Sequence, residues 1–513
     1  MILRTAFKII TILTTLFTGC SSPEEGQETA QWDIYELVLN GPSTGNPYME
    51  VELFAVFTNG DVSITVPGFY DGEGTYRVRF SPGEQGTWSY ETESNTPELS
   101  GQSGTFRCVP PGKGNHGPVK IVSTFYFEYA DGTPYYAVGT TAYQWTSVKQ
   151  TIQEKTLETL ADAPFNKIRM CVFPKSYQYG NKTEPWAYVF DRTDGQNDLS
   201  RPNYAFFQNF DQRVAALRDM GIQADVILFH PYDSWGYSEM GDEMNEKYVR
   251  HMIARLSAYR NVWWSLANEW DVPEIKETID WEGIGTLLQK EDPHQRFRGI
   301  HNWYGSEDHF YDHSRPWITH VSTQTSQFYN ALKWRNRYRK PLLFDEMRYE
   351  GDVPSGWGQL SSQEMASYFW MAGLSGGYPT HGDTFTNQAD DSTEVRWWAK
   401  GGLLVGESPE RIGYFRSVMA DAPVPEMIPE LLPHGDSTSL NTNVYTFSKP
   451  GVYYLAYVAD AGQTIELDLE GDADYKLDIL DTWNMKVVEQ RTAEPGKLSF
   501  QTELPYTALR IYK

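Results

Sequence analysis

Apolar and polar residues alternate in short runs at both ends of the chain. Clusters of Gly, Pro and Asn separate these runs, a rhythm typical of antiparallel β-sandwiches. In the N-terminal part we expect strands at 35–39, 48–57, 62–66, 75–80 and 87–92. The same rhythm returns between Val444 and Lys513. The pattern therefore predicts a small β domain at each end of the chain.

The middle of the chain, from about residue 120 to 430, alternates strand-like and helix-like segments. Apolar residues at helical spacing predict one helix at Phe210–Met220, closed by Gly221 as its C′ residue, and another at Asn245–Tyr259. Eight apolar segments are expected strands, at 135–140, 167–173, 224–229, 261–267, 297–301, 318–323, 341–345 and 376–382. This alternation favours a barrel over a doubly wound sheet. The predicted fold class is α/β, a (β/α)8 TIM barrel flanked by two β-sandwich domains.

The N-terminus carries a targeting pattern. Arg4 and Lys8 precede the apolar run Ile9–Phe17, and Cys20 follows closely. The run is too short to span a bilayer as a helix, so it predicts a signal peptide. The sequence FTGCSS resembles a bacterial lipoprotein signal, although Phe17 stands where Leu is usual. The resemblance implies that Cys20 is acylated and that a lipid anchors the protein in the bacterial cell envelope, at the outer membrane, on its periplasmic face or at the cell surface.

These patterns divide the chain into a signal peptide at 1–20, a tether at 21–30, β-sandwiches at 31–118 and 433–513, and a barrel at 119–432. With Cys20 assigned to lipid, Cys108 and Cys171 remain, and they fall in different domains. We therefore expect no disulfide framework.

Composition limits the range of partners. The net charge of -25 argues against nucleic acid and anionic membrane surfaces as partners. Aromatic residues make up 15% of the chain, and they serve either as core filling or as stacking platforms for sugar rings. No CxxC pair or HExxH motif suggests zinc, and we expect neither a cofactor nor an obligate protein partner.

Side chains at the C-terminal ends of barrel strands form the active sites of this fold. The polar and aromatic residues at the predicted strand ends are Arg169, Lys175, His230, Tyr232, Asn268, Glu269, His301, Trp303, Gln324, Asp345, Glu346, His381 and Asp383. A carboxylate after the apolar run WWSLA at 263–267 is costly to bury there. Two carboxylates across a barrel mouth are what glycoside hydrolysis requires, since one protonates the leaving oxygen and the other attacks or activates water.

The pattern resembles clan A glycoside hydrolases, whose catalytic acids lie on strands four and seven. The resemblance rests on YRNVWWSLANEWD at 259–271, KPLLFDEM at 340–347, and Arg169 in strand two. It implies that Glu269 is the general acid/base and Glu346 the nucleophile. It also implies that Asn268 binds the 2-hydroxyl of the sugar and that Arg169 supports the nucleophile.

A narrower resemblance, to the apiosidase-like group of bacterial barrels, rests on THGDTF at 380–385 and WWAKGGLL at 397–404. That group often carries an N-terminal Ig-like domain and a C-terminal β domain. The resemblance covers most of residues 31–513.

Several roles stay open at this stage. Asp345 directly precedes Glu346, and only one of them should face the pocket because strand side chains alternate. Glu269 is alternatively a salt-bridged loop acid, and Arg169 a structural ion-pair partner. The candidate substrate contacts His230, His301, His381, Trp303 and Trp145 are alternatively structural residues.

The leading hypothesis is a retaining glycoside hydrolase that acts on plant or algal polysaccharide, marine sources included, or on its oligosaccharides. Retention predicts carboxyl groups about 5–5.5 Å apart, and inversion about 6.5–9.5 Å. The alternatives are a catalytically silent carbohydrate-binding lipoprotein and a metal-dependent hydrolase. The loop at 174–206 is long enough to wall the pocket into a site for terminal sugars.

Overall fold

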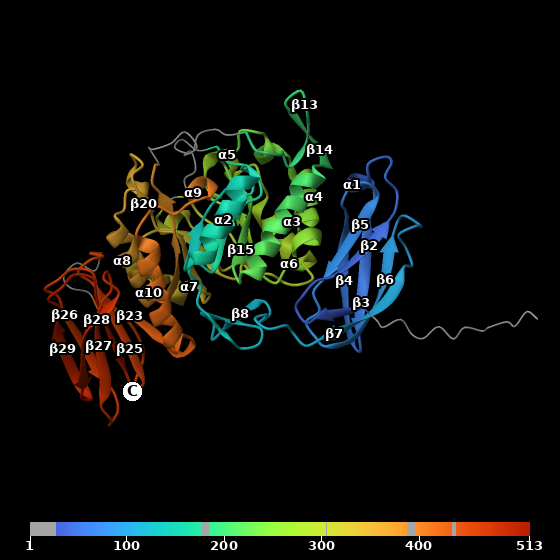
Figure 1. Cartoon of the computed structure of the whole chain (residues 1–513). Helices are drawn as coiled ribbons and strands as arrows, with labels where there is room; N and C mark the ends of the chain where they lie inside the picture. Colours follow the sequence, from blue (N-terminus) through green and yellow to red (C-terminus); the bar gives the residue numbers. More distant parts are fainter. Residues whose placement is uncertain (1–26, 177–183, 304, 387–396, 433–437) are drawn as a thin grey trace, which may run out of the picture.

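The structure is a computed structural model that describes residues 27–176, 184–303, 305–386, 397–432 and 438–513. Cys20 and the predicted signal peptide lie outside these residues. Within them, no helix combines the length and the hydrophobicity that crossing a bilayer demands. Figure 1 shows a central α/β body, with one β-rich domain at its N-terminal side and another at its C-terminal side.

The central body is an eight-stranded parallel sheet, which confirms the predicted barrel. Its strands are β11 (Gly139–Thr141), β12 (Lys167–Cys171), β15 (Gln223–Phe229), β16 (Val262–Ala267), β17 (Arg298–Gly299), β18 (Val321–Gln324), β19 (Leu342–Glu346) and β21 (Gly377–His381). The sheet order is β17-β16-β15-β12-β11-β21-β19-β18, so its two end strands are consecutive in the chain. Each of the eight predicted strand segments overlaps one of these strands.

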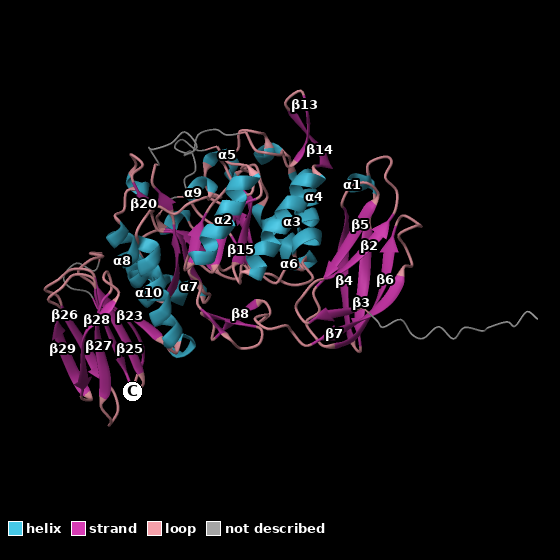
Figure 2. Cartoon of the chain, in the orientation of Figure 1, coloured by secondary structure: helices cyan, strands magenta, loops and turns pink. Residues whose placement is uncertain are grey.

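Helices cover the outside of this sheet (Figure 2). The longer ones are α2 (Gln150–Asp162), α3 (Tyr204–Asp219), α4 (Asp242–Leu256), α6 (Trp281–Glu291), α7 (Ala331–Tyr338), α8 (Ser362–Leu374) and α10 (Ser408–Asp421). Helix α3 ends at Asp219 with Met220 as its C-cap, and Gly221 follows with a φ of 74°, the left-handed conformation expected of a C′ glycine.

A small meander closes the N-terminal end of the barrel. It comprises β8 (Val119–Val122), β9 (Tyr126–Tyr129) and β10 (Pro134–Tyr135). Phe127 packs against Trp263 of β16 and Tyr378 of β21, with ring centroids 5.3 and 4.8 Å apart. This apolar plug leaves the opposite end of the barrel for chemistry.

The N-terminal domain is a seven-stranded sheet in the order β1-β7-β6-β3-β4-β5-β2, folded around an aromatic core. Its strands are β1 (Glu28–Ala30), β2 (Tyr35–Asn40), β3 (Leu53–Asn59), β4 (Val62–Tyr70), β5 (Thr75–Phe80), β6 (Gly86–Ser94) and β7 (Ser103–Val109). The single strand predicted at 48–57 is wrong in its first half. Asn46 caps a short helix, α1 (Pro47–Glu50), and Pro47 occupies its first turn, so β3 begins only at Leu53.

A buried ionic network joins this domain to the barrel. Arg255 of α4 contacts Asp71 at 2.8 Å and Asp211 of α3 at 2.6 Å. Arg79 of β5 also reaches Asp211, at 2.8 Å. Buried charges are stable only when paired, so this network fixes the orientation of the two domains.

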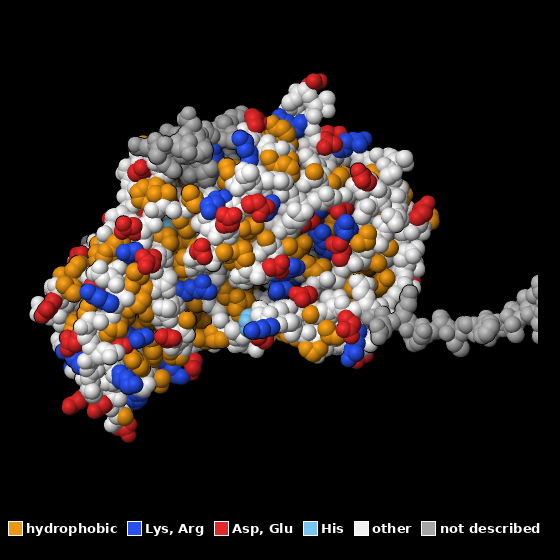
Figure 3. All heavy atoms as spheres, in the orientation of Figure 1, with side chains coloured by type: hydrophobic (Ala, Val, Ile, Leu, Met, Phe, Trp, Pro, Cys, Tyr) orange, Lys and Arg blue, Asp and Glu red, His pale blue; other side chains and the backbone are white. Residues whose placement is uncertain are grey.

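The C-terminal domain packs on α8 mainly through aromatic rings. A six-stranded sheet contains β23 (Ile428–Leu432), β24 (Val444–Lys449), β25 (Tyr453–Val458), β27 (Tyr475–Asp481), β28 (Lys486–Ala493) and β30 (Thr507–Tyr512). A two-stranded antiparallel sheet of β26 (Thr464–Leu469) and β29 (Gly496–Gln501) covers it. At the seam with α8, Tyr457 stacks on Trp370 at 5.6 Å and donates a 2.7 Å hydrogen bond to Ser367. Figure 3 shows acidic and basic side chains interspersed over one face of the molecule.

Candidate active site

A cavity of about 580 Å³ opens at the C-terminal end of the barrel. Every barrel strand brings at least one lining residue to it from its C-terminal end or the loop that follows. These residues include Tyr143, Lys175, Tyr232, Glu269, Trp303, Gln324, Glu346 and Trp398. Polar and aromatic side chains that are far apart in the sequence therefore meet at the C-terminal end of the barrel.

Glu269 lies at the floor of this cavity in an unusual backbone conformation. Its φ is 61°, which is uncommon for any residue other than glycine and costs on the order of 1–3 kcal/mol. The backbone on either side is fixed, because the Asn268 N–H donates to Phe229 O at 3.0 Å and the Trp270 N–H donates to His301 O at 2.9 Å. The strained position turns the carboxyl group into the cavity.

The surroundings of Glu269 favour its protonated form. The side chain is buried, and its Oε2 has no hydrogen-bond partner among the described residues. Burial, followed by the charge of Glu346, raises the pKa of Glu269 to about 8, while Lys175 and Tyr232 oppose the shift. The neighbouring Trp270 does not line the cavity and packs on Tyr311, with ring centroids 5.0 Å apart. A carboxylic acid in this state is able to donate a proton near neutral pH.

Glu346 reaches the same cavity from β19 because of an irregularity in that strand. The register between β18 and β19 shifts after Thr323, so that Gln324 pairs with Glu346 and Asp345 is skipped. Such a bulge redirects the side chains that follow it. Glu346 lines the cavity as a result, and Asp345 does not.

Hydrogen-bond donors from neighbouring side chains surround the Glu346 carboxyl group. Its Oε1 accepts a hydrogen bond from the Tyr143 hydroxyl and lies 3.5 Å from Arg169 Nη1. Tyr349 is a further hydrogen-bond partner. Tyrosine and arginine donors stabilise an ionised carboxylate in a fixed orientation.

Arg169 and Asn268 lie behind the two glutamates. Arg169 is fully buried, and its Nη2 donates to Asn268 Oδ1 at 3.2 Å. Burial alone would lower the pKa of this guanidinium, but Tyr143 and nearby acids raise it. Arg169 therefore stays charged beneath the cavity, and Asn268 presents its amide at the cavity wall.

Lys175 is a buried cation at the cavity wall. Its Nζ lies 3.9 Å from the Tyr143 ring centroid and 4.8 Å from that of Tyr232. Burial lowers the pKa of Lys175, while Glu269 and Glu346 work in the opposite direction. The lysine thus balances some of the negative charge of the two acids.

Four of the residues expected to contact substrate do not line the cavity. Trp145, His301 and His381 are fully buried. His230 is nearly so, and its Nε2 lies 3.1 Å from the Phe173 carbonyl oxygen. Their positions at or near strand ends suggested substrate contact, but each side chain packs inside the protein. Trp303, by contrast, is 41% exposed and lines the cavity as expected.

Sequence reasoning missed several cavity residues. Tyr143 lies two residues beyond β11, Tyr349 three residues beyond β19, and Trp357 and Trp398 come from later loop segments. The signal available was the aromatic content of the loops after strands one, seven and eight. Their convergence depends on tertiary structure. Residues 177–183 of the 174–206 loop, and residues 387–396, lie outside the described part of the chain.

Among the described residues, no cluster of three or more His, Cys, Asp or Glu side chains is placed to hold a metal ion. The two described cysteines, Cys108 and Cys171, are buried and free.

Family comparisons agree with the geometry. Residues 123–399 match the apiosidase-like catalytic domain. Residues 28–95 and 443–512 match two domains of unknown function, DUF5060 and DUF5605. No curated protein matches the chain.

Solved structures resemble the whole chain or its larger part. A protein from Bacteroides vulgatus ATCC 8482, provisionally named a glycoside hydrolase, is 36% identical with a TM-score of 0.85, over 95% of this chain and 99% of that one. A family 5 glycoside hydrolase from the same strain has a TM-score of 0.63 at 16% identity, over 78% of this chain and 93% of that one. The second similarity is one of fold alone.

Proposed function

The chain belongs to the apiosidase-like family, and from that premise we propose that this glycoside hydrolase cleaves O-glycosidic bonds with retention of configuration. Glu346 is the nucleophile and Glu269 the general acid/base. One observation carries the proposal: glutamates from two non-adjacent strands face one cavity, one in surroundings that favour its protonated form and the other held by hydrogen-bond donors.

In the first step, a Glu346 oxygen attacks the anomeric carbon of the bound sugar. The bond from that carbon to the leaving oxygen breaks, and the Glu269 proton passes to the leaving oxygen. In the second step, Glu269, now ionised, takes a proton from water as the water attacks the anomeric carbon. The ester bond to Glu346 breaks, and both glutamates return to their starting states.

The residues around the pair support this division of roles. Tyr143 and Arg169 hold the Glu346 carboxyl group in a fixed orientation, while burial favours the protonated form of Glu269. Asn268 lies beside Glu269 on the cavity wall, in position to bind a sugar hydroxyl.

We propose plant or algal polysaccharides and their oligosaccharides as the substrate class. Trp303, Trp357 and Trp398 line the cavity, and flat apolar rings with a polar edge suit sugar faces.

The envelope anchor also stays a proposal, resting on the sequence around Cys20. Labelling with radioactive palmitate tests it in cells. We expect label in the wild-type protein and none in Cys20→Ser, and equal labelling of the two would contradict the anchor.

The function itself is tested by incubating the protein with a panel of plant and marine glycans and separating the products by chromatography. We expect at least one glycan to yield smaller saccharides with the wild type and none with Glu346→Gln. Binding of a glycan without any product would favour the silent carbohydrate-binding alternative.

A further inference from the structure

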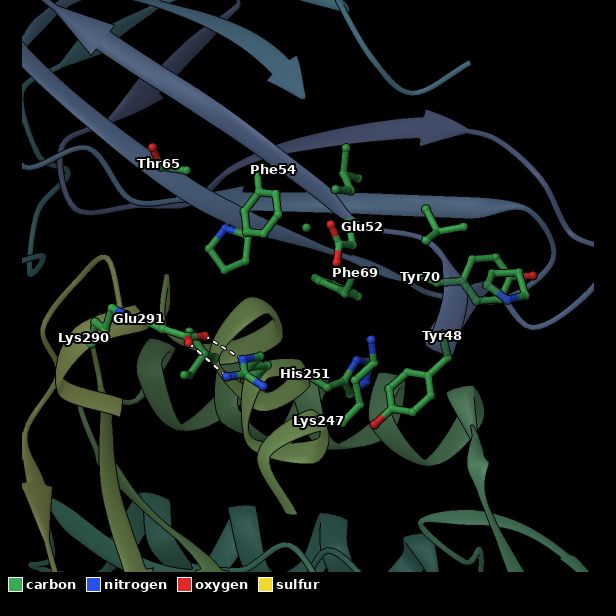
Figure 4. A pocket seen from close by; sticks show the side chains of 17 residues that line it. Tyr48, Glu52, Phe54, Thr65, Phe69, Tyr70, Lys247, His251, Lys290 and Glu291 are labelled. Atoms are coloured by element: carbon green, nitrogen blue, oxygen red, sulfur yellow. Dashed lines mark hydrogen bonds and ion pairs between the residues drawn. The ribbon is translucent and has the colours of Figure 1, made fainter. Parts of the chain in front are cut away.

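A second cavity, of about 560 Å³, lies in the seam between the N-terminal domain and the barrel, lined by residues distinct from those of the active-site cavity. Figure 4 shows Phe54 and Thr65 on the strands of the N-terminal domain and Lys247 and His251 on the facing helix. We name it the seam cavity. Its volume falls within the range of about 300–1,000 Å³ that is usual for small-molecule sites.

The walls of the seam cavity are aromatic. Phe54 is 39% exposed, although it sits on a strand facing another domain. Tyr48, Phe69 and Tyr70 line the cavity and are buried. Aromatic faces that stay partly open inside a domain seam suit the apolar face of a sugar ring.

Two buried polar groups in the lining of the seam cavity are available for hydrogen bonds to a ligand. The Tyr48 hydroxyl and His251 Nε2 are buried without a hydrogen-bond partner among the described residues. The two rings meet edge to face, with centroids 5.4 Å apart. Burying a polar group without a partner is costly, so a ligand atom that pairs with either group would relieve that cost.

The cations of the seam cavity differ in their pairing. Arg250 is occupied by Glu291 at 2.9 Å and Glu246 at 3.0 Å. Lys247 and Lys290 have no carboxylate within ion-pair distance in the part of the chain described. Lys247 Nζ lies 5.4 Å from the Tyr48 ring centroid. Burial lowers the pKa of Lys247, and the charge of Glu52 partly offsets this.

The groups left over are three donors, the ammonium groups of Lys247 and Lys290 and the Tyr48 hydroxyl, and one carboxylate, that of Glu52. Hydrogen-bond donors beside aromatic side chains suit a ligand that has both a ring face for stacking and negatively charged oxygens that accept hydrogen bonds. The lining holds three cations, Lys247, Arg250 and Lys290, and two acids, Glu52 and Glu291, so the seam cavity is slightly positive in a chain whose net charge is -25.

We propose that the seam cavity is a second saccharide-binding site, separate from the active site, and that it binds an oligosaccharide bearing a carboxylate or sulfate group. Phe54 stacks on a sugar ring, Lys247 pairs with the acidic group, and the Tyr48 hydroxyl donates to a ligand oxygen.

Isothermal titration calorimetry on full-length protein carrying Glu346→Gln tests the proposal without turnover. The probes are trigalacturonic acid for carboxylates, a sulfated galactan trisaccharide for sulfates, and cellotriose as the neutral control. We expect one of the acidic probes to bind, with an affinity that falls at least tenfold from 50 to 300 mM salt. The acidic probe that binds more tightly identifies the acidic group.

Further variants in the same background locate the binding. Phe54→Ala and Lys247→Met should each weaken it at least tenfold, and Tyr48→Phe should weaken it without lowering the melting temperature. Lys113→Met, an exposed lysine outside the cavity, and Trp303→Ala in the active-site cavity should leave the affinity unchanged. The proposal is overturned if neither acidic probe binds, if cellotriose binds equally well, or if Trp303→Ala abolishes binding while Phe54→Ala and Lys247→Met do not affect it.

Discussion

Carboxyl groups lie both at the mouth of the barrel and in a buried cluster of ion pairs directly beneath it, here called the chamber, but only those of the chamber are closely paired with a cation among the described residues. In the chamber, Lys167 lies 2.6 Å from Asp225 and 2.8 Å from Asp345, and Ser322 donates to Asp345 at 2.5 Å. Although burial opposes it, Lys167 and Arg169 lower the pKa of Asp345. At the mouth, Glu269 faces an open cavity, and one of its oxygens has no hydrogen-bond partner in the described part of the chain.

The difference separates structural acids from chemical ones. A buried carboxylate with a cation and hydrogen bonds at short distance is satisfied, and its role is to hold the strands together. A carboxyl group left partly unsatisfied beside a cavity keeps its reactivity for a substrate. Arg169 joins the two layers, since it lies 3.7 Å from Asp225 and 3.5 Å from Glu346. Through Arg169, the buried ion pairs of the chamber thereby help to position the Glu346 carboxyl group at the mouth.

The largest expected effect comes from Glu346→Gln. Without the proposed nucleophile, kcat should fall roughly 10⁴-fold, about 5.5 kcal/mol of transition-state stabilisation. The melting temperature should stay near that of the wild type, because the amide keeps the shape of the side chain. Steady-state kinetics and thermal unfolding measure the two quantities, and a variant with near-normal kcat would remove Glu346 from the mechanism.

Glu269→Ala should lower the rate about 10²–10⁴-fold on substrates with a poor leaving group. Aryl glycosides with a good leaving group should be affected far less, and added azide should restore their turnover. The pKa of Glu269 is raised to about 8, so wild-type kcat/KM should fall as the pH rises through 8 and the acid loses its proton. That alkaline limb should be missing in Glu269→Ala. A limb that persists there belongs to another group.

Lys167→Met removes the ion pairs of the chamber and leaves the residues that line the active-site cavity unchanged. It leaves Asp225 and Asp345 buried without their cation, so the free energy of unfolding should fall by about 3–5 kcal/mol. Lys155→Met is the matched control: it removes an exposed pair with Glu158, worth about 0.2–1 kcal/mol. Urea denaturation compares the two, and equal losses would refute the structural role of the chamber.

Trp303→Ala should have the smallest effect. Loss of an exposed stacking face at the cavity wall should raise KM about tenfold, or about 1.4 kcal/mol, with kcat nearly unchanged. A large fall in kcat with unchanged KM would place Trp303 in the chemistry and not in binding.

Much of the fold could be predicted from the sequence, because the length and spacing of apolar runs determine where its strands and helices form. The eight strands of the barrel were all predicted, even β17, which spans only Arg298–Gly299. The break before β3 was missed because an N-cap at Asn46 followed by proline outweighs the strand propensity of YMEVELF.

The candidate site was predictable only in part. Glu269 and Glu346 follow strands that the sequence marks clearly, so both were identified. Which of Asp345 and Glu346 faces the cavity depends on a bulge that no local pattern announces. Tyr143 and Tyr349 both contact Glu346 through their hydroxyl groups. Tyr143 lies about two hundred residues before Glu346 in the sequence, so only the folded structure shows that the three side chains meet.

The most direct test of the central claim is to trap the covalent intermediate. A 2-deoxy-2-fluoro glycoside of an accepted sugar, carrying a good leaving group, should label the wild-type enzyme, and mass spectrometry of its peptides should locate the adduct on Glu346. Glu346→Gln should remain unlabelled. An adduct on Asp345 or Glu269, or a first-formed product of inverted anomeric configuration by NMR, would contradict the account.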